Sequence, residues 1–303
     1  MGWYRTEFDV PQFQAGKRAT ILFDGAMSHA NVYINGQKVG YWPYGYNSFH
    51  FDITKYLKPG QKNTLAVRLE NQPESSRWYP GAGLYRNVHL IVTEDAYIPV
   101  WGTYITTPSV NEKFAKVNVR AKVVLPEGAD PARYSVETSL WNPDKQKLTA
   151  VRTSLAQMKY DNDQVEQDFI IQDPSLWSPE MPALYSAETR LYEGDKLKDI
   201  YTTPYGIRSI EIIPDKGFFL NGKQTVFKGV CNHHDLGPLG VAVNDAAIRR
   251  QIRILKDMGC NAIRTSHNMP APELIRACDE MGMMIMAESF DEWNVAKCRN
   301  GYN

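Results

Sequence analysis

The feature that most constrains the fold is a change in the hydrophobic pattern near Gly206. Before this residue, short segments alternate polar and apolar side chains with a period of two, as strands with one buried face do. After it, short apolar runs alternate with segments that repeat apolar residues every three or four positions. The chain therefore has to combine antiparallel β domains with the opening of a parallel α/β domain.

Residues 1–96 form the first of three regions and consist of short strands separated by turns. Arg18–Phe23, Ala30–Ile34 and Thr64–Leu69 are three of these expected strands. Asn35-Gly36 follows the second of them and is the strongest short-range hairpin signal. This pattern predicts a jelly roll or a related β-sandwich.

Residues 97–207 continue the β pattern. Lys116–Val123, Tyr134–Trp141 and Tyr185–Tyr192 each alternate with a period of two. The region has about 110 residues, and a seven-stranded immunoglobulin-like sandwich has about 100. The pattern therefore predicts such a sandwich, here without a cysteine pair.

Residues 208–303 change to alternating strands and helices. The expected strands are Val226–Val230, Asn261–Arg264 and Met283–Met286, and the last is apolar throughout, as in a parallel strand buried on both faces. The first helix covers Ala246–Met258, is capped by Asn244, and is expected to bury Ile248, Ile252, Leu255 and Met258. The second helix covers Pro270–Glu280, with Leu274, Ile275 and Cys278 facing inward.

This last region predicts the first three βα units of a parallel barrel. A complete (β/α)₈ barrel takes about 250 residues, and the remaining chain is far shorter. We therefore expect the chain to be truncated at its C-terminus, with part of the barrel missing.

Composition argues against several classes of partner. The chain has 34 Lys and Arg and 34 Asp and Glu, so it lacks the basic surface that nucleic acids require. It has no polybasic cluster and no apolar run of membrane-spanning length, so we expect no membrane partner. No signal peptide is visible, which leaves a cytoplasmic or a periplasmic location open. The sequence also leaves open whether the protein forms a homo-oligomer.

The four cysteines, Cys231, Cys260, Cys278 and Cys298, all lie in the last quarter of the chain. None has the spacing of a metal-ligand pair, and a secreted disulfide framework would place pairs in the β domains. We expect four thiols without disulfides, mostly buried, and no metal or other cofactor.

One segment of the third region carries a family resemblance. Asn261-Ala262-Ile263-Arg264-Thr265-Ser266-His267 is followed by Pro270, Asp279, Gly282 and the apolar run Met283–Met286. This spacing resembles the signature of glycoside hydrolase family 2, the β-galactosidase and β-glucuronidase group. The sequence departs from it at Asn268-Met269, where the family usually has Tyr-Pro.

Upstream segments resemble the same family. They are Gly2–Phe8, Asp24–Gly40, Gly83–Val88 and Phe218–Val230. The resemblance implies a jelly-roll sugar-binding domain, an immunoglobulin-like sandwich and a barrel. The family's first domain begins before the Trp3-Tyr4-Arg5 strand, so we also expect the N-terminus to be clipped.

The resemblance implies a β-glycosidase that retains the configuration of the sugar. Such enzymes use two carboxyl groups about 5–5.5 Å apart, one as acid/base and one as nucleophile. In the family these groups end the fourth and seventh barrel strands, so both are expected beyond Asn303 and we name no catalytic residue in this chain. For the same reason, we expect no hydrolysis of nitrophenyl β-galactoside by these 303 residues alone.

The resemblance also implies residues that bind the substrate. His267 matches a histidine that contacts the sugar, and His233 and Asp235 match a His-x-Asp pattern after the first strand. Glu288 stands at the end of the third strand. Arg264 is expected either to orient its charge toward the nucleophile or to form an ion pair in the barrel core.

Aromatic residues are further candidates for the substrate site. Trp78 lies on a loop that approaches the barrel mouth in the family, and Trp101 stands near a position where several members have an aspartate. Both are also compatible with ordinary packing between domains.

Two functions of different classes follow from the sequence. The first is an exo-acting hydrolase of terminal β-D-galactosides, with β-glucuronidase and β-mannosidase as alternatives in the same family. The second is a carbohydrate-binding module without catalytic activity. A binding module has no need of Arg264–His267 at the junction between a strand and a loop, so we favour the hydrolase.

Overall fold

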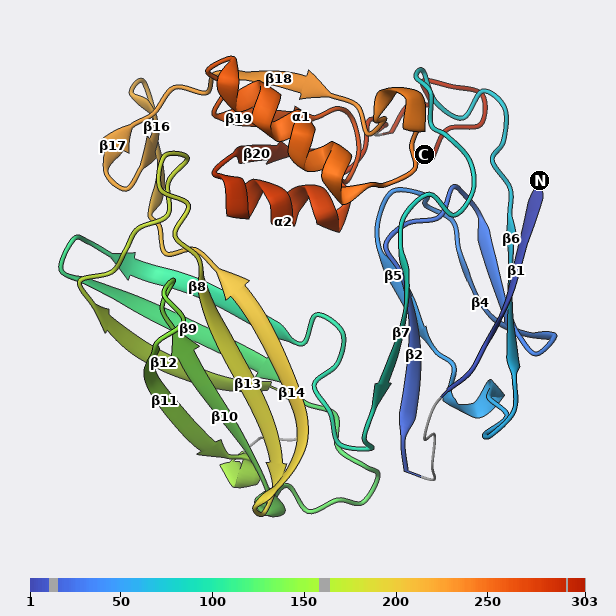
Figure 1. Ribbon diagram of the computed structural model, residues 1–303, viewed down its shortest axis with the longest axis horizontal. Helices are drawn as coiled ribbons and strands as arrows, with labels where there is room; N and C mark the ends of the chain where they lie inside the picture. The colour runs from blue at the N-terminus through green and yellow to red at the C-terminus, as the bar shows by residue number, and fades with distance from the viewer. Residues whose placement is uncertain (11–15, 158–163, 293, 303) are drawn as a thin grey trace. The chain divides into compact units, whose positions relative to one another are not determined.

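The computed structural model describes residues 1–10, 16–157, 164–292 and 294–302. The chain divides into two compact units. The first unit contains residues 1–92, 228–278 and 283–303, and the second contains residues 93–227 and 279–282. The polypeptide thus leaves the first unit, forms the second and returns (Figure 1).

A β-sandwich makes up the front part of the first unit. One sheet has the order β1 (Gly2–Phe8), β6 (Asn63–Leu69), β3 (Ala30–Ile34) and β4 (Gln37–Trp42). The other has the order β5 (Phe49–Asp52), β2 (Arg18–Phe23) and β7 (Val88–Thr93), and a short 3₁₀ turn, η1, covers Thr54–Tyr56. Buried and partly exposed residues alternate along β2, β3 and β6, so their inward side chains form one core between the sheets.

The turn between β3 and β4 confirms the hairpin predicted from Asn35-Gly36. Asn35 has a φ of 51° and Gly36 a φ of 82°. Both angles are positive, which is the requirement that makes Asn-Gly the favoured pair for this turn.

The described residues of the second unit form mainly a seven-stranded sandwich, as expected for an immunoglobulin-like domain. One sheet has the order β11 (Lys147–Ser154), β10 (Tyr134–Trp141), β13 (Tyr185–Glu193) and β14 (Lys196–Tyr205). The other has the order β12 (Gln164–Gln172), β9 (Phe114–Lys122) and β8 (Thr103–Val110). The unit also holds two 3₁₀ turns, η2 (Pro131–Arg133) and η3 (Leu155–Gln157), and a small sheet of β15 (Ile210–Ile213), β16 (Gly217–Leu220) and β17 (Lys223–Gln224).

The predicted barrel opening lies in the first unit. Three parallel strands occur in the order β18 (Gly229–Asn232), β19 (Ala262–Thr265) and β20 (Met284–Ala287). A 3₁₀ turn, η4 (Gly237–Leu239), and α1 (Asp245–Asp257) connect the first two strands, and α2 (Pro272–Met281) connects the last two. Asn244 caps α1, because its side chain accepts a hydrogen bond from the backbone N–H of Ala247 at 3.0 Å.

Several predicted burial patterns are wrong in this region. On the helices, Ile248, Ile252 and Leu255 are buried as expected, but Met258 is 68% exposed and Ile275 is 36% exposed. The first strand begins at Gly229, after the exposed Val226 and Phe227. Only one face of each helix packs on a three-stranded sheet, so the apolar residues at the ends of the stripes extend past it.

The third strand is also less buried than its sequence predicts. Met283 and Met284 are buried, whereas Met286 is 52% exposed. A strand is buried on both faces only where other elements cover both, and hydropathy alone does not determine that. In the part of the chain that the structure describes, no helix is both long and apolar enough to cross a lipid bilayer.

Candidate functional site

Three parallel strands bring polar side chains to one edge of a sheet. Asn232 at the end of β18 is in register with Thr265 on β19, and Thr265 is in register with Ala287 on β20. The residues that follow these strands therefore emerge at the same edge, as they do at the functional face of parallel barrels. His267 and Glu288 are among them.

Arg264 and Glu288 form the centre of this edge. Nε of Arg264 donates to Oε1 of Glu288 at 2.6 Å, and a second guanidinium nitrogen also contacts that oxygen. The backbone N–H of Glu288 donates to the Thr265 hydroxyl at 3.1 Å. Of the two expectations for Arg264, the ion pair is therefore present.

His267 completes the cluster. Its Nδ1 lies 3.0 Å from Oε2 of Glu288 and 3.3 Å from a guanidinium nitrogen of Arg264. One ring nitrogen cannot both donate to Glu288 and accept from Arg264, and the shorter contact to a carboxylate favours donation. This choice makes Nε2 an acceptor in the neutral imidazole, which suits a hydroxyl donor.

Trp78 lies against two histidines, His267 and His233. Its ring centroid is 5.4 Å from that of His267 and 5.8 Å from that of His233, and the two histidine rings are 5.5 Å apart. The indole N–H donates to the hydroxyl of Tyr46 at 3.2 Å. This hydrogen bond to Tyr46 holds the Trp78 ring in place beside the cluster of Arg264, His267 and Glu288.

A cleft opens beside this cluster. It has a volume of about 590 Å³ and is lined by Arg264, His267, Glu288, Ser289, Phe290, Asp291 and Lys297. Small-molecule sites range from about 300 to 1,000 Å³. The cleft has room for a single sugar ring, the ligand that we expect from the sequence, and we therefore call this space the sugar cleft.

Asp291 closes one side of the sugar cleft and is held by cations. Two nitrogen–oxygen contacts of 2.9 and 2.8 Å join Arg77 to its carboxylate, and Lys297 lies 3.4 Å from Oδ1. Burial alone would raise the pKa of Asp291, but the hydrogen bonds from Arg77 and Lys297 outweigh it and lower the pKa. Asp291 is therefore ionised at neutral pH.

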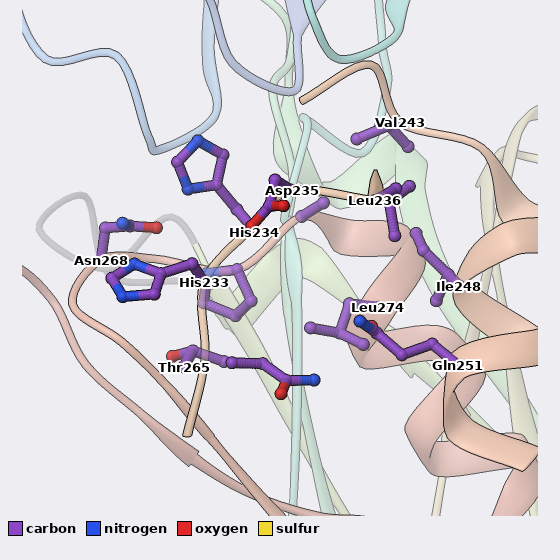
Figure 2. A pocket seen from close by; sticks show the side chains of 13 residues that line it. His233, His234, Asp235, Leu236, Val243, Ile248, Gln251, Thr265, Asn268 and Leu274 are labelled. Carbon is purple, nitrogen blue, oxygen red and sulfur yellow. The ribbon is translucent and has the colours of Figure 1, made fainter. Parts of the chain in front are cut away.

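Asp235 lines a separate, smaller cavity. In Figure 2, His233 and Asn268 lie on one side of this cavity, and Ile248 and Leu274 lie on the other. Its volume is about 40 Å³. That is room for water but not for a sugar ring.

The His233-His234-Asp235 run does not behave as one group of ligands. Nε2 of His234 bonds to the carbonyl of Pro80 at 2.9 Å, whereas His233 packs against Trp78 and His267. Among the described residues, no three histidine, cysteine or acidic side chains are arranged to hold a metal ion.

Arg86 connects the sandwich to the loop after His267. Its guanidinium donates to the carbonyls of Asp24, Tyr46, Met269 and Pro270. The side chain is only 4% exposed. A buried cation with four carbonyl acceptors holds this loop against the strand that carries Arg86.

Trp101 belongs to the second unit. Its side chain is 55% exposed, and its backbone N–H donates to the hydroxyl of Tyr201 at 3.3 Å. Its role at the substrate site stays a prediction. The same holds for sugar contacts by His267, His233, Asp235, Glu288, Arg264 and Trp78.

Other residues that contact the lining of the sugar cleft were missed from the sequence. Cys231, expected to be mostly buried like the other thiols, is exposed, and its Sγ lies 3.5 Å from Arg264. Only Cys278 of the four cysteines is buried, and the four form no disulfide with one another. Cys231 lies on β18, two positions before His233, and this spacing of two could have identified it.

Arg77 and Lys297 could not have been found in this way. Arg77 comes from a sandwich loop and Lys297 from the segment after β20, 220 positions apart. No spacing rule joins such residues.

Three family models match this chain in succession. Residues 1–94 match glycosyl hydrolases family 2, sugar binding domain, residues 97–208 match glycosyl hydrolases family 2, and residues 211–300 match glycosyl hydrolases family 2, TIM barrel domain.

Curated relatives agree with these models. The chain is 44% identical over 303 residues to a β-galactosidase of Bacteroides ovatus, a match that covers 100% of this chain and 36% of the relative. It is 39% identical over 296 residues to a putative β-glucuronidase of Formosa agariphila, covering 97% of this chain and 28% of that protein. The chain thus spans about a third of the length of these relatives.

Solved structures show the same architecture. A glycosyl hydrolase family 2 member from Bacteroides cellulosilyticus matches with a TM-score of 0.92 and 34% identity, covering 99% of this chain and 39% of that one. A β-glycosidase from Bacteroides vulgatus matches with a TM-score of 0.91 and 36% identity, covering 99% of this chain and 38% of that one.

Proposed function

The chain belongs to family 2 of the glycosyl hydrolases, and on that premise we propose that it forms part of the sugar site of an exo-acting β-glycosidase. The proposed reaction is hydrolysis of terminal β-D-galactosides with retention of configuration. The observation that carries the proposal is the cluster of Arg264, His267 and Glu288 beside a cleft of about 590 Å³.

The three side chains offer complementary hydrogen-bonding groups to a sugar. Glu288 uses one oxygen for Arg264 and the other for His267, and a carboxylate keeps further lone pairs for sugar hydroxyls. Nε2 of His267 accepts from a hydroxyl when Nδ1 donates to Glu288. Trp78 adds an aromatic face next to both histidines.

The cleaving carboxyl groups are proposed to lie elsewhere. Retention needs one carboxyl group that donates a proton and a second, about 5–5.5 Å away, that attacks the sugar. Glu288 is bonded to Arg264 and His267, and Asp291 is bonded to Arg77 and Lys297. Both carboxylates accept hydrogen bonds from N–H groups, so neither is suited to act as the proton donor. We propose that the acid/base and the nucleophile belong to the two thirds of the relatives' length that this chain does not span.

A β-glucuronidase is the second candidate. It is supported by the 39% identity to the putative β-glucuronidase of Formosa agariphila and by the cations Arg264, Arg77 and Lys297 around the sugar cleft. A uronate carboxylate needs cations that are not already neutralised, however, and these three are paired with Glu288 or Asp291. We therefore favour the neutral sugar.

A panel of nitrophenyl β-glycosides, assayed with the full-length protein that carries this chain, tests the proposal. We expect turnover of the galactoside to exceed that of the glucuronide and the mannoside, with the β-anomer of galactose released first, as seen by proton NMR. His267→Ala should lower galactoside kcat/KM, whereas His50→Ala, on the exposed part of β5, is the matched control. Preference for the glucuronide or release of the α-anomer would overturn the proposal.

A further inference from the structure

Three asparagines in this chain are followed by glycine: Asn35-Gly36, Asn221-Gly222 and Asn300-Gly301. An asparagine in such a pair can lose its side-chain amide spontaneously, because glycine has no side chain to keep its backbone nitrogen away from the asparagine. The asparagine side chain has to move toward that nitrogen for the reaction to occur. Hydrogen bonds in the folded protein oppose this movement, so the three pairs should differ in how readily they react.

The side chain of Asn35 is held by three hydrogen bonds. Its amide nitrogen donates to the Tyr56 carbonyl at 2.9 Å and to the side-chain oxygen of Asn63 at 2.8 Å. Its oxygen accepts from the backbone N–H of Thr64 at 3.0 Å. Because both polar ends of the side chain are occupied, we expect Asn35 to react slowly.

Asn221 is held in a similar way. Its side-chain oxygen accepts from the backbone N–H of Ser209 at 3.0 Å, and its amide nitrogen donates to the Trp177 carbonyl at 3.1 Å. Both ends of this side chain are again bonded, so we also expect slow reaction at Asn221.

Asn300 is held less firmly than the other two asparagines. Its amide nitrogen donates to the Pro73 carbonyl at 2.7 Å, and within the described ranges its side-chain oxygen accepts no hydrogen bond. The backbone N–H of Gly301, the group that would attack, makes only a long contact of 3.3 Å to the Cys298 carbonyl. One side-chain hydrogen bond therefore has to break before Asn300 can react.

The fold also requires glycine after Asn300. Glu292 is 2% exposed and accepts from the backbone N–H of Tyr302 at 3.0 Å. A Cβ at Gly301 would clash with Oε2 of this carboxylate. Packing against Glu292 thus excludes the side chains at position 301 that would slow the attack.

Asn300 fastens the segment that follows β20 to the first sandwich. Besides the side-chain bond to Pro73, its backbone N–H donates to the Glu74 carbonyl at 3.1 Å. The same segment carries Lys297, which lies 3.4 Å from Asp291 and lines the sugar cleft. A carboxylate at position 300 has no N–H to donate and would place an oxygen against the Pro73 carbonyl, so the side-chain bond would be lost.

We propose that Asn300 is a site of spontaneous deamidation, and that its conversion releases residues 294–302 from the sandwich. The backbone nitrogen of Gly301 attacks Cγ of Asn300, the bond between Cγ and Nδ2 breaks, and ammonia leaves with the proton of the attacking nitrogen. Water then opens the cyclic imide at either carbonyl, which yields aspartate or isoaspartate. Water is the only co-reactant, and the reaction does not depend on which sugar the protein cleaves.

Peptide mass spectrometry tests the deamidation. The full-length protein that carries this chain is incubated at mildly alkaline pH, which favours attack by the backbone nitrogen, both folded and in urea. In the folded protein, conversion at Asn300 should be roughly tenfold faster or more than at Asn35, where two further hydrogen bonds have to break. In urea, the three pairs should convert at similar rates. Exposed Asn294 is the internal control, because the branched side chain of Val295 follows it and should keep it unconverted.

Limited trypsin digestion tests the release. Asn300→Asp should be cleaved after Lys297 about fivefold faster than the unaltered protein, the factor expected when one hydrogen bond no longer opposes local opening. Asn294→Asp adds the same charge to the segment away from the Pro73 contact and should be cleaved at the unaltered rate.

Two results would overturn the inference. The first is equal conversion at the three pairs in the folded protein, or no conversion at Asn300 while the sample in urea reacts. The second is equal cleavage of Asn300→Asp and the unaltered protein, which would show that this side chain does not hold the segment.

Discussion

Nδ1 of His267 lies 3.0 Å from Oε2 of Glu288, so side chains that follow two neighbouring strands are joined by a hydrogen bond. The carboxylate is shared with Arg264. This arrangement sets the tautomer of His267 and the orientation of Glu288 together, because each orients the other. Changes to one of them should therefore alter sugar binding through both.

Replacing Glu288 by glutamine tests this coupling. Glu288→Gln leaves Arg264 without its anion and gives His267 a weaker acceptor. Since a hydrogen bond to a charged group contributes about 1.5–3 kcal/mol, kcat/KM for the galactoside should fall by roughly ten- to a hundredfold. The measurement is steady-state kinetics of the full-length protein, with the exposed Glu7→Gln on β1 as control. Unchanged kinetics would exclude Glu288 from the sugar site.

Arg86 is expected to contribute to stability rather than to chemistry. Arg86→Met removes a side chain that donates to four backbone carbonyls, of which the Asp24 carbonyl keeps the Ser48 hydroxyl as a donor. A buried carbonyl left without a partner costs about 1–3 kcal/mol. We expect a loss of about 3 kcal/mol or more, measured by urea denaturation of this chain. Arg5→Met, on the exposed surface of β1, should change stability by less than about 0.5 kcal/mol. Similar midpoints for the two variants would contradict the role of Arg86.

His234 should make the stability depend on pH. Burial, reinforced by the charge of Arg86, lowers the pKa of His234, although the hydrogen bond to Pro80 acts in the opposite direction. The folded form therefore keeps His234 neutral below about pH 6.5, where the unfolded chain takes up a proton. The stability that this group contributes is complete above pH 6.5 and is lost as the pH falls toward the lowered folded-state value.

The corresponding experiment compares urea midpoints between pH 5 and pH 8. His234→Gln retains a donor for the Pro80 carbonyl and should flatten the decline at acid pH. His233→Gln, at the exposed neighbouring position, should leave the decline of the urea midpoint at acid pH unchanged. An unchanged acid decline in His234→Gln would assign the effect to another group.

Cys231 is expected to be the most reactive thiol. It is exposed, and the hydrogen bond from Arg264 lowers its pKa. Because the thiolate is the reactive form, iodoacetamide at neutral pH should modify Cys231 before the buried Cys278. Arg264→Gln should slow the modification of Cys231, and peptide mass spectrometry gives the rate at each site. Equal rates at Cys231 and Cys278 would show that the predicted environment is wrong.

Local patterns determined much of the fold. The period-two strands Arg18–Phe23, Ala30–Ile34 and Tyr134–Trp141 have the predicted bounds, because alternation with one buried face specifies a strand by itself. The Asn35-Gly36 turn and the Asn244 cap were predictable for the same reason, since each depends on residues a few positions apart. The order of β18, α1, β19, α2 and β20 follows from the change of period.

The sequence by itself therefore determined the classes of element, their order and the edge of the sheet at which His267 and Glu288 emerge. Only the tertiary structure decided that Glu288 pairs with Arg264 and His267, that Arg77 reaches Asp291 across 214 positions, and that Met258 and Met286 are exposed. The physical reason is the range of the interactions. Strand and helix patterns come from neighbouring residues, whereas ion pairs, burial and pockets depend on which distant segments the packed chain brings together.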